Sequence, residues 1–165
     1  MRNFPPHLFN PENAVPEGCR FRLATEQDLM PLYTAFYLER PILNFRAYFQ
    51  RQLDRQERRR ALWLVVEAAN VIIGSGQCII YPEVGELANL NVKPDFRNQG
   101  IGSAMIELLV ELARHIGMSN VEIGVSADNE LALKLYCRLG FSQDRTLRMG
   151  ESAPAIILRK SFEPE

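Results

Sequence analysis

The stretch that decides the fold is Leu90-Asn91-Val92-Lys93-Pro94-Asp95-Phe96-Arg97-Asn98-Gln99-Gly100-Ile101-Gly102-Ser103, which reads as a buried strand, a turn and the start of a helix. Gly100 and Gly102 allow backbone N–H groups to approach a ligand because no Cβ stands in the way. Unpaired N–H groups at a helix start bind phosphate, and the helix dipole adds to the attraction. Arg97 supplies a cation nearby. The turn therefore suits a pyrophosphate.

Two other phosphate-binding motifs do not fit this stretch. A P-loop requires GxxxxGK[ST], and no lysine follows the second glycine here. A dinucleotide fingerprint requires GxGxxG, and Met105 occupies the place of its third glycine. What remains is Arg-x-x-Gly-x-Gly after a strand that ends Leu-x-Val. A structural turn explains such a glycine pair about as well as a ligand site does, so the interpretation requires a second motif.

The second motif lies just after the next predicted strand. It is Asn129-Glu130-Leu131-Ala132-Leu133-Lys134-Leu135-Tyr136-Cys137-Arg138-Leu139-Gly140-Phe141, or Asn-x-x-Ala-x-x-Leu-Tyr-x-x-x-Gly-Phe. With this motif the chain strongly resembles the GNAT superfamily of acetyl-CoA-dependent N-acetyltransferases. The resemblance covers Phe21 to Lys160, with both main motifs of the family in their usual order and separation.

The resemblance implies a mixed α/β (α+β) fold. Its central sheet of six to seven mostly antiparallel strands should carry about four helices on its two faces. The strands Glu86–Val92 and Val121–Val125 should splay apart and leave a cleft for the cofactor. Residues 1–165 are expected to form a single acyltransferase domain, with residues 1–19 as an N-terminal extension.

Apolar periodicity and turn signals predict the individual elements. Helices are expected from Asp28 to about Leu38 and over Phe45–Arg59, Gly100–Ile116 and Glu130–Leu139. Strands are expected over Arg20–Ala24, Ala61–Ala68, Val71–Ile80, Glu86–Val92, Val121–Val125, Phe141–Met149 and Ala155–Lys160. Gly74 and Gly76 lie inside one of these strands, where glycine indicates a bulge or a close backbone contact.

The resemblance also assigns the cofactor-binding residues. The main chain of Leu90, Asn91 and Val92 would pair with the pantetheine arm like an added strand. Asn129 would hydrogen-bond the same arm, and Tyr136 would lie near the sulfur. The pyrophosphate would be held by Arg97, Asn98, Gln99, Gly100, Ile101, Gly102 and Ser103.

Two residues are candidates for catalysis. Glu86 begins the strand that leads to Val92, and some family members carry a catalytic glutamate at this place, where it would take the proton of the amine. An ordinary solvated carboxylate is the alternative. Tyr136 would protonate the departing coenzyme A thiolate, or else its ring packs against the cofactor.

Composition restricts the class of protein. The 165 residues carry a formal net charge of -1, which argues against a general nucleic-acid binder. No apolar run reaches the roughly 18 residues that span a bilayer, and no signal peptide is recognisable, so we expect a cytoplasmic protein with no membrane partner. Three scattered cysteines and two histidines show no metal-ligand spacing, so no metal site is expected.

The function predicted from these features is transfer of an acetyl group from acetyl-CoA directly to a primary amine of a small molecule or a protein. A non-catalytic acyl-CoA sensor and a transferase for a longer acyl group are the alternatives, and a homodimer is left open. An arginine cluster could steer an acidic acceptor or form a solvated helix end. Aromatic residues in the first two helices could line the acceptor pocket or the core. The cluster is Arg51, Arg55, Arg58, Arg59 and Arg60, and the aromatic residues are Tyr33, Phe36, Tyr37 and Phe45.

Overall fold

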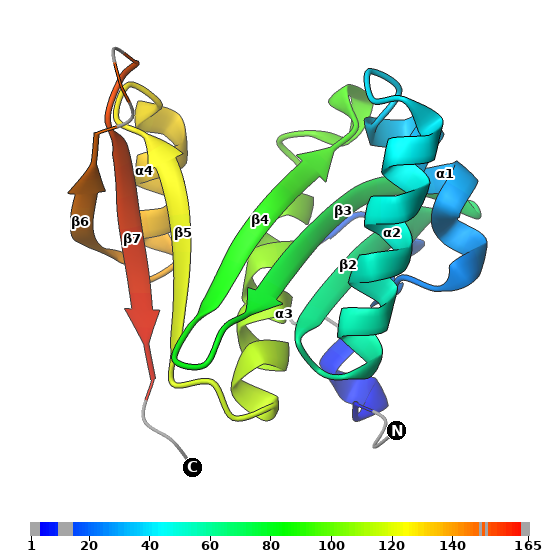
Figure 1. Cartoon of the computed structure of the whole chain (residues 1–165), viewed down its shortest axis with the longest axis horizontal. Coiled ribbons are helices and arrows are strands. Elements are labelled where there is room, and N and C mark those ends of the chain that lie inside the picture. The colour runs from blue at the N-terminus through cyan, green and yellow to red at the C-terminus, as the bar shows by residue number, and fades with distance from the viewer. Residues whose placement is uncertain (1–3, 10–14, 149, 151, 163–165) are drawn as a thin grey trace.

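The computed structural model describes residues 4–9, 15–148, 150 and 152–162, and they form an open seven-stranded sheet (Figure 1). The strand order is β1-β2-β3-β4-β5-β7-β6, and every neighbouring pair is antiparallel except β4 and β5. The predicted mixed, mostly antiparallel sheet is therefore confirmed. The strands are β1 (Cys19–Leu23), β2 (Ala61–Ala68), β3 (Val71–Ile80), β4 (Gly85–Val92), β5 (Asn120–Ser126), β6 (Ser142–Leu147) and β7 (Ala155–Ser161).

Helices cover both faces of the sheet, as predicted (Figure 1). On one face lie α1 (Leu29–Phe36) and α2 (Ile42–Glu57), and on the other lie α3 (Ile101–His115) and α4 (Glu130–Arg138). The expected element bounds agree to within about three residues. Gly100, expected as the first residue of its helix, is instead the residue that precedes α3. Met149, expected to end a strand, lies outside the described residues.

Each face of the sheet has its own hydrophobic core. The core beneath α3 takes Leu62, Leu64 and Val66 from β2, while Trp63 and Val65 of the same strand point into the core beneath α1 and α2. Successive side chains of a strand point to opposite faces, so a strand buried on both faces reads as an unbroken apolar run. The aromatic residues of the first two helices pack in the second core: Tyr37 and Phe45 are buried, and Tyr33 and Phe36 pack against it.

A β-bulge on β4 shapes the strand that precedes the phosphate-binding turn. Ser75 pairs with Asn91 and Gln77 with Ala88, so two residues of β4 oppose the single Gly76 of β3. Asn89, in the bulge, has a φ of +52°. A Cβ at position 76 would lie 2.6 Å from the side chain of Leu90, which confirms the close contact expected there. The bulge turns Leu90 back toward the core beneath α3.

The parallel pair β4 and β5 stays together over only part of its length. Pairing joins Gly85, Glu86 and Leu87 to Val121, Glu122 and Ile123 and stops there. Beyond this point the strands diverge, as Figure 1 shows. From Ala88 to Val92 the edge of β4 that faces β5 therefore has no strand partner within the described chain, whereas its other edge remains paired with β3. The predicted splay is confirmed.

Candidate active site

The turn after β4 presents an exposed helix start. Asn98 and Gly100 adopt left-handed backbone conformations, with φ of +58° and +83°, and Arg97 through Gly100 are exposed. The first N–H groups of α3 have no carbonyl acceptors within their own helix. Arg97 lies across the end of β4, since its Nε donates to the Val92 carbonyl oxygen at 2.9 Å. These features would suit the binding of an anion at the turn.

Gly102 has no structural reason to be glycine. A Cβ placed there would meet only Val92 Cγ2, at 4.0 Å, which is an ordinary van der Waals contact. The φ of Gly102 lies outside the left-handed region, whereas Gly100 adopts a left-handed conformation. The fold would therefore accept a side chain at position 102. The missing Cβ is explained better by the close approach of a ligand to the backbone.

The predicted residues on α4 lie near its two ends. Asn129 caps the helix, because its Oδ1 accepts from the Ala132 N–H at 3.2 Å, and its amide nitrogen is left to donate to a ligand. Tyr136 is half-buried, with its ring centroid 6.3 Å from that of Phe141. Burial raises the pKa of Tyr136, so its hydroxyl carries its proton at neutral pH.

Glu86 lines a pocket of about 280 Å³ on the face of the sheet that carries α1 and α2. Its neighbours there include Tyr81, Glu122 and Arg145. Burial raises the pKa of Tyr81, and the negative charge of Glu86 and its hydrogen bond with Tyr81 raise it further. The positive charge of Arg55 acts in the opposite direction and lowers it. Glu86 itself is exposed to solvent, so its carboxylate is accessible from this pocket.

Glu122 sits beside Glu86 in the register of the parallel pair but has a different environment. Arg145 Nη2 lies 2.9 Å from its Oε2, and Arg159 Nε lies 3.0 Å from its Oε1. Its side chain is only 9% exposed. The hydrogen bonds from Arg145 and Arg159 outweigh the effect of burial and hold the pKa of Glu122 at about 2. Of the two carboxylates, Glu86 is therefore the more accessible to a ligand.

The two catalytic candidates lie on opposite faces of the sheet. Leu87 points into the core beneath α3, so Glu86 points to the other face, while Tyr136 packs against the core beneath α3. The divergence of β4 and β5 lies between them. The sequence interpretation missed Tyr81, Glu122 and Arg145. A glutamate inside the apolar run of β5 was a readable signal for Glu122, whereas Arg145 had none.

These features are typical of one class of protein, the acyltransferases that use acyl-CoA. The sequence model of the Acetyltransferase (GNAT) family matches residues 24–141. The chain belongs to this family, which confirms the predicted class of acetyl-CoA-dependent acyltransferases.

Individual relatives agree with this assignment. An uncharacterized N-acetyltransferase of Methanocaldococcus jannaschii is 39% identical over 66 residues, a match that spans 40% of this chain and 29% of that protein. A ribosomal L7/L12 α-N-protein acetyltransferase in complex with coenzyme A superposes with a TM-score of 0.79 at 16% identity, covering 92% of this chain and 98% of the other. The ribosomal-protein-S18-alanine N-acetyltransferase of Escherichia coli superposes with a TM-score of 0.70 at 20% identity. The match covers 87% of this chain and 93% of the other. These two structures share the fold.

The described residues also limit other kinds of site. None of their helices is both long and apolar enough to cross a bilayer. Among the same residues, no group of three or more His, Cys, Asp or Glu side chains is placed to hold a metal ion.

Proposed function

We propose that this protein transfers the acetyl group of acetyl-CoA directly to a primary amine of a small molecule or a protein. The observation that carries the proposal is the divergence of β4 from β5 directly above Glu86. It leaves a free strand edge that leads into the exposed start of α3, and it separates the two catalytic candidates. Such an arrangement suits direct transfer, in which the acceptor amine meets the thioester without a covalent enzyme intermediate.

The residues around the divergence would hold acetyl-CoA at three places. The free edge of Leu90, Asn91 and Val92 would pair with the amide groups of the pantetheine arm. The N–H groups of the turn from Arg97 to Ser103 would bind the pyrophosphate. Asn129, across the gap on α4, would donate its amide N–H to the arm. Pairing to a free strand edge suits an extended amide-containing chain, because main-chain groups supply both donors and acceptors.

The reaction forms a bond between the amine nitrogen and the acetyl carbonyl carbon, and it breaks the bond between that carbon and sulfur. Starting from the protonated amine, the nitrogen gives up two protons: Glu86 accepts the first through water, and the second passes to solvent as the amide forms. The departing thiolate gains one proton from Tyr136, which then takes a proton from solvent. Deprotonating a lysine-like amine of pKa about 10.4 at pH 7 costs about 4.6 kcal/mol, against about 1.4 kcal/mol for an α-amine of pKa about 8. A free N–H near the bulge of β4 would stabilise the developing oxyanion.

Two further observations favour a protein amine in the cytoplasm. The two structural neighbours described above are named for acetylation of ribosomal proteins. The pocket around Glu86 also opens to solvent on the face of the sheet opposite to α3, where a protruding chain terminus can reach it. The names of the neighbours support a cytoplasmic acceptor, and we propose the same compartment for this protein.

A panel of acceptors tests the proposed function. Release of the coenzyme A thiol from acetyl-CoA should be slow without an acceptor and should rise when small amines, lysine peptides or peptides with free N-termini are supplied. Mass spectrometry of the best acceptor should show one added acetyl group. Tight binding of acetyl-CoA without acceleration by any amine would instead favour a non-catalytic sensor. Faster thiol release from a longer acyl-CoA than from acetyl-CoA would identify the longer acyl-CoA as the donor.

Tyr136→Phe should reduce turnover roughly 10- to 100-fold with little change in acetyl-CoA affinity. The substitution keeps the ring that packs against Phe141 and removes the proton donor. The reduction should be closer to about 10-fold than to about 100-fold. A thiol of pKa about 8.5 is a good leaving group without help, and burial raises the pKa of the tyrosine. Turnover that is unchanged with the best acceptor would show that Tyr136 only packs.

A further inference from the structure

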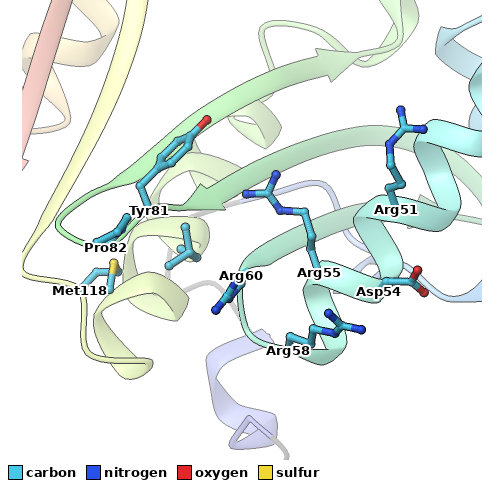
Figure 2. A pocket seen from close by; sticks show the side chains of 9 residues that line it. Arg51, Asp54, Arg55, Arg58, Arg60, Tyr81, Pro82 and Met118 are labelled. Carbon is cyan, nitrogen blue, oxygen red and sulfur yellow. The ribbon is translucent and has the colours of Figure 1, made fainter.

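Figure 2 shows the residues that line a second hollow, of about 820 Å³, which shares Tyr81 with the pocket around Glu86. It is bounded by the end of α2, the turn between β3 and β4, and the connection from α3 to β5. Its floor is apolar, formed by Ile80, Pro82 and Met118. Four arginines surround it, and we call it the arginine hollow. They are Arg51, Arg55, Arg58 and Arg60.

Ion pairs within the described residues do not neutralise the positive charge of the arginine hollow. None of its four arginines forms an ion pair with a carboxylate in the part of the chain that the structure describes. The single carboxylate in its wall, Asp54, accepts a hydrogen bond from Gln50 at 3.2 Å. Like charges gathered without partners repel one another, so an anionic ligand would stabilise the cluster. This arrangement goes beyond a solvated helix end.

The arginine hollow connects to the candidate catalytic base through one side chain. Tyr81 lines both this hollow and the pocket that contains Glu86. Figure 2 shows Arg55 extending from α2 toward Tyr81. The β4 bulge at Asn89 lies three positions after Glu86, which is about 10 Å along a strand. An extended peptide whose amine lies at the bulge would pass Glu86 after about three residues and enter the hollow from about the fourth.

We infer that the acceptor is a polypeptide with a free N-terminal amine and acidic side chains from about its fourth residue onward, which bind in the arginine hollow. The inference rests on the proposed function. The bonds made and broken are those of acetyl transfer to the α-amine, and the acidic segment only binds. The hollow thus selects among amines by charge at a distance from the reacting atoms.

The geometry favours a peptide over other anions. Arg51 and Arg55 lie one turn apart on α2, and Arg58 and Arg60 follow the end of that helix, so the guanidinium groups are spread along the hollow rather than gathered around one point. Several carboxylates on a flexible chain match this spread better than one small anion does. A nucleic acid is also a polyanion, but it offers no basic aliphatic amine to be acetylated. The apolar floor suits the aliphatic parts of peptide side chains.

Two peptides and two matched variants test this inference. The peptides share their first three residues and carry either four aspartates or four lysines at positions 4–7. Arg55→Glu should raise KM for the acidic peptide about tenfold or more and should lower it for the lysine peptide. Arg46→Glu makes the same change of charge on the same helix, outside the hollow, and should alter neither value. Binding of a labelled acidic peptide, followed by fluorescence anisotropy, should weaken in parallel and should fall with added salt.

The outcomes separate this inference from the proposed function. Acetylation of both peptides with equal KM in the wild type and both variants would contradict the arginine hollow and leave the acetyltransferase activity intact. Binding of the acidic peptide without acetylation of any peptide would overturn the acceptor role together with the proposed function. A short RNA that displaces the labelled peptide more effectively than the unlabelled acidic peptide does would assign the hollow to a nucleic acid instead.

Discussion

Replacing Gly102 by Asp is expected to weaken acetyl-CoA binding at least about 100-fold, or about 2.7 kcal/mol, while the fold remains intact. The new carboxylate would stand in the first turn of α3, where we propose that the pyrophosphate binds and where a Cβ meets nothing closer than 4.0 Å. The same carboxylate would interact favourably with the helix dipole, so stability should not fall. Isothermal titration calorimetry measures the affinity, and thermal unfolding checks the fold.

Two alanine variants serve as controls for this prediction. Gly102→Ala adds a Cβ without a charge and should cost less affinity than the aspartate. Gly100→Ala acts on a residue with a φ of +83°, so it should lower the stability by about 1 kcal/mol. If Gly102→Asp binds acetyl-CoA as tightly as the wild type and is folded, the pyrophosphate does not lie at this turn.

Local patterns in the sequence predicted the elements that position the site. The helical spacing of Ile101, Met105, Leu108 and Leu112 predicted α3, and these residues are buried in the core beneath it. Gly74 and Gly76 inside β3 predicted a bulge or a close backbone contact, and the bulge of β4 lies opposite Gly76. Such features depend on neighbouring residues, so single-sequence reasoning reaches them.

The environment of Glu86 could not be predicted in this way. Arg145 and Arg159 come from the last two strands, 23 and 37 residues after the Glu122 that they contact. Tyr81 acquires its place because the turn between β3 and β4 folds toward the end of α2. Contacts across such distances are set by strand order and by the path of loops, which periodicity does not encode. The residues that distinguish one acceptor from another belong to this group, so fold and donor were predicted and the acceptor was not.

Groups that attract anions lie at both ends of β4. The turn proposed to bind the pyrophosphate lies beyond the end of β4, and the arginine hollow lies before the beginning of β4. Glu86 and the bulge lie between them. A donor held at one end and an acceptor held at the other would meet at the bulge. Glu86 would then face the amine on the acceptor side, whereas Glu122 is paired with its two arginines.

Glu86→Gln is expected to slow turnover about 100-fold or more near pH 7 and progressively less as the pH rises. Glutamine keeps the size of the side chain and removes the base. Raising the pH deprotonates the amine without help, so recovery should be nearly complete for an acceptor of pKa about 8 and partial for one of about 10.4. The measurement is turnover against pH, from about 6.5 to 9.5, for both proteins with one acceptor.

Glu122→Gln is the matched control for this pH dependence, because it removes the neighbouring carboxylate of the same sheet face. Arg145 and Arg159 hold the pKa of Glu122 at about 2, so its carboxylate stays ionised throughout this range of pH. Any loss of turnover in Glu122→Gln should therefore be the same factor at every pH, since it comes from altered positioning of Arg145. A constant ratio for Glu86→Gln as well would show that Glu86 does not remove the proton and that it serves binding or structure.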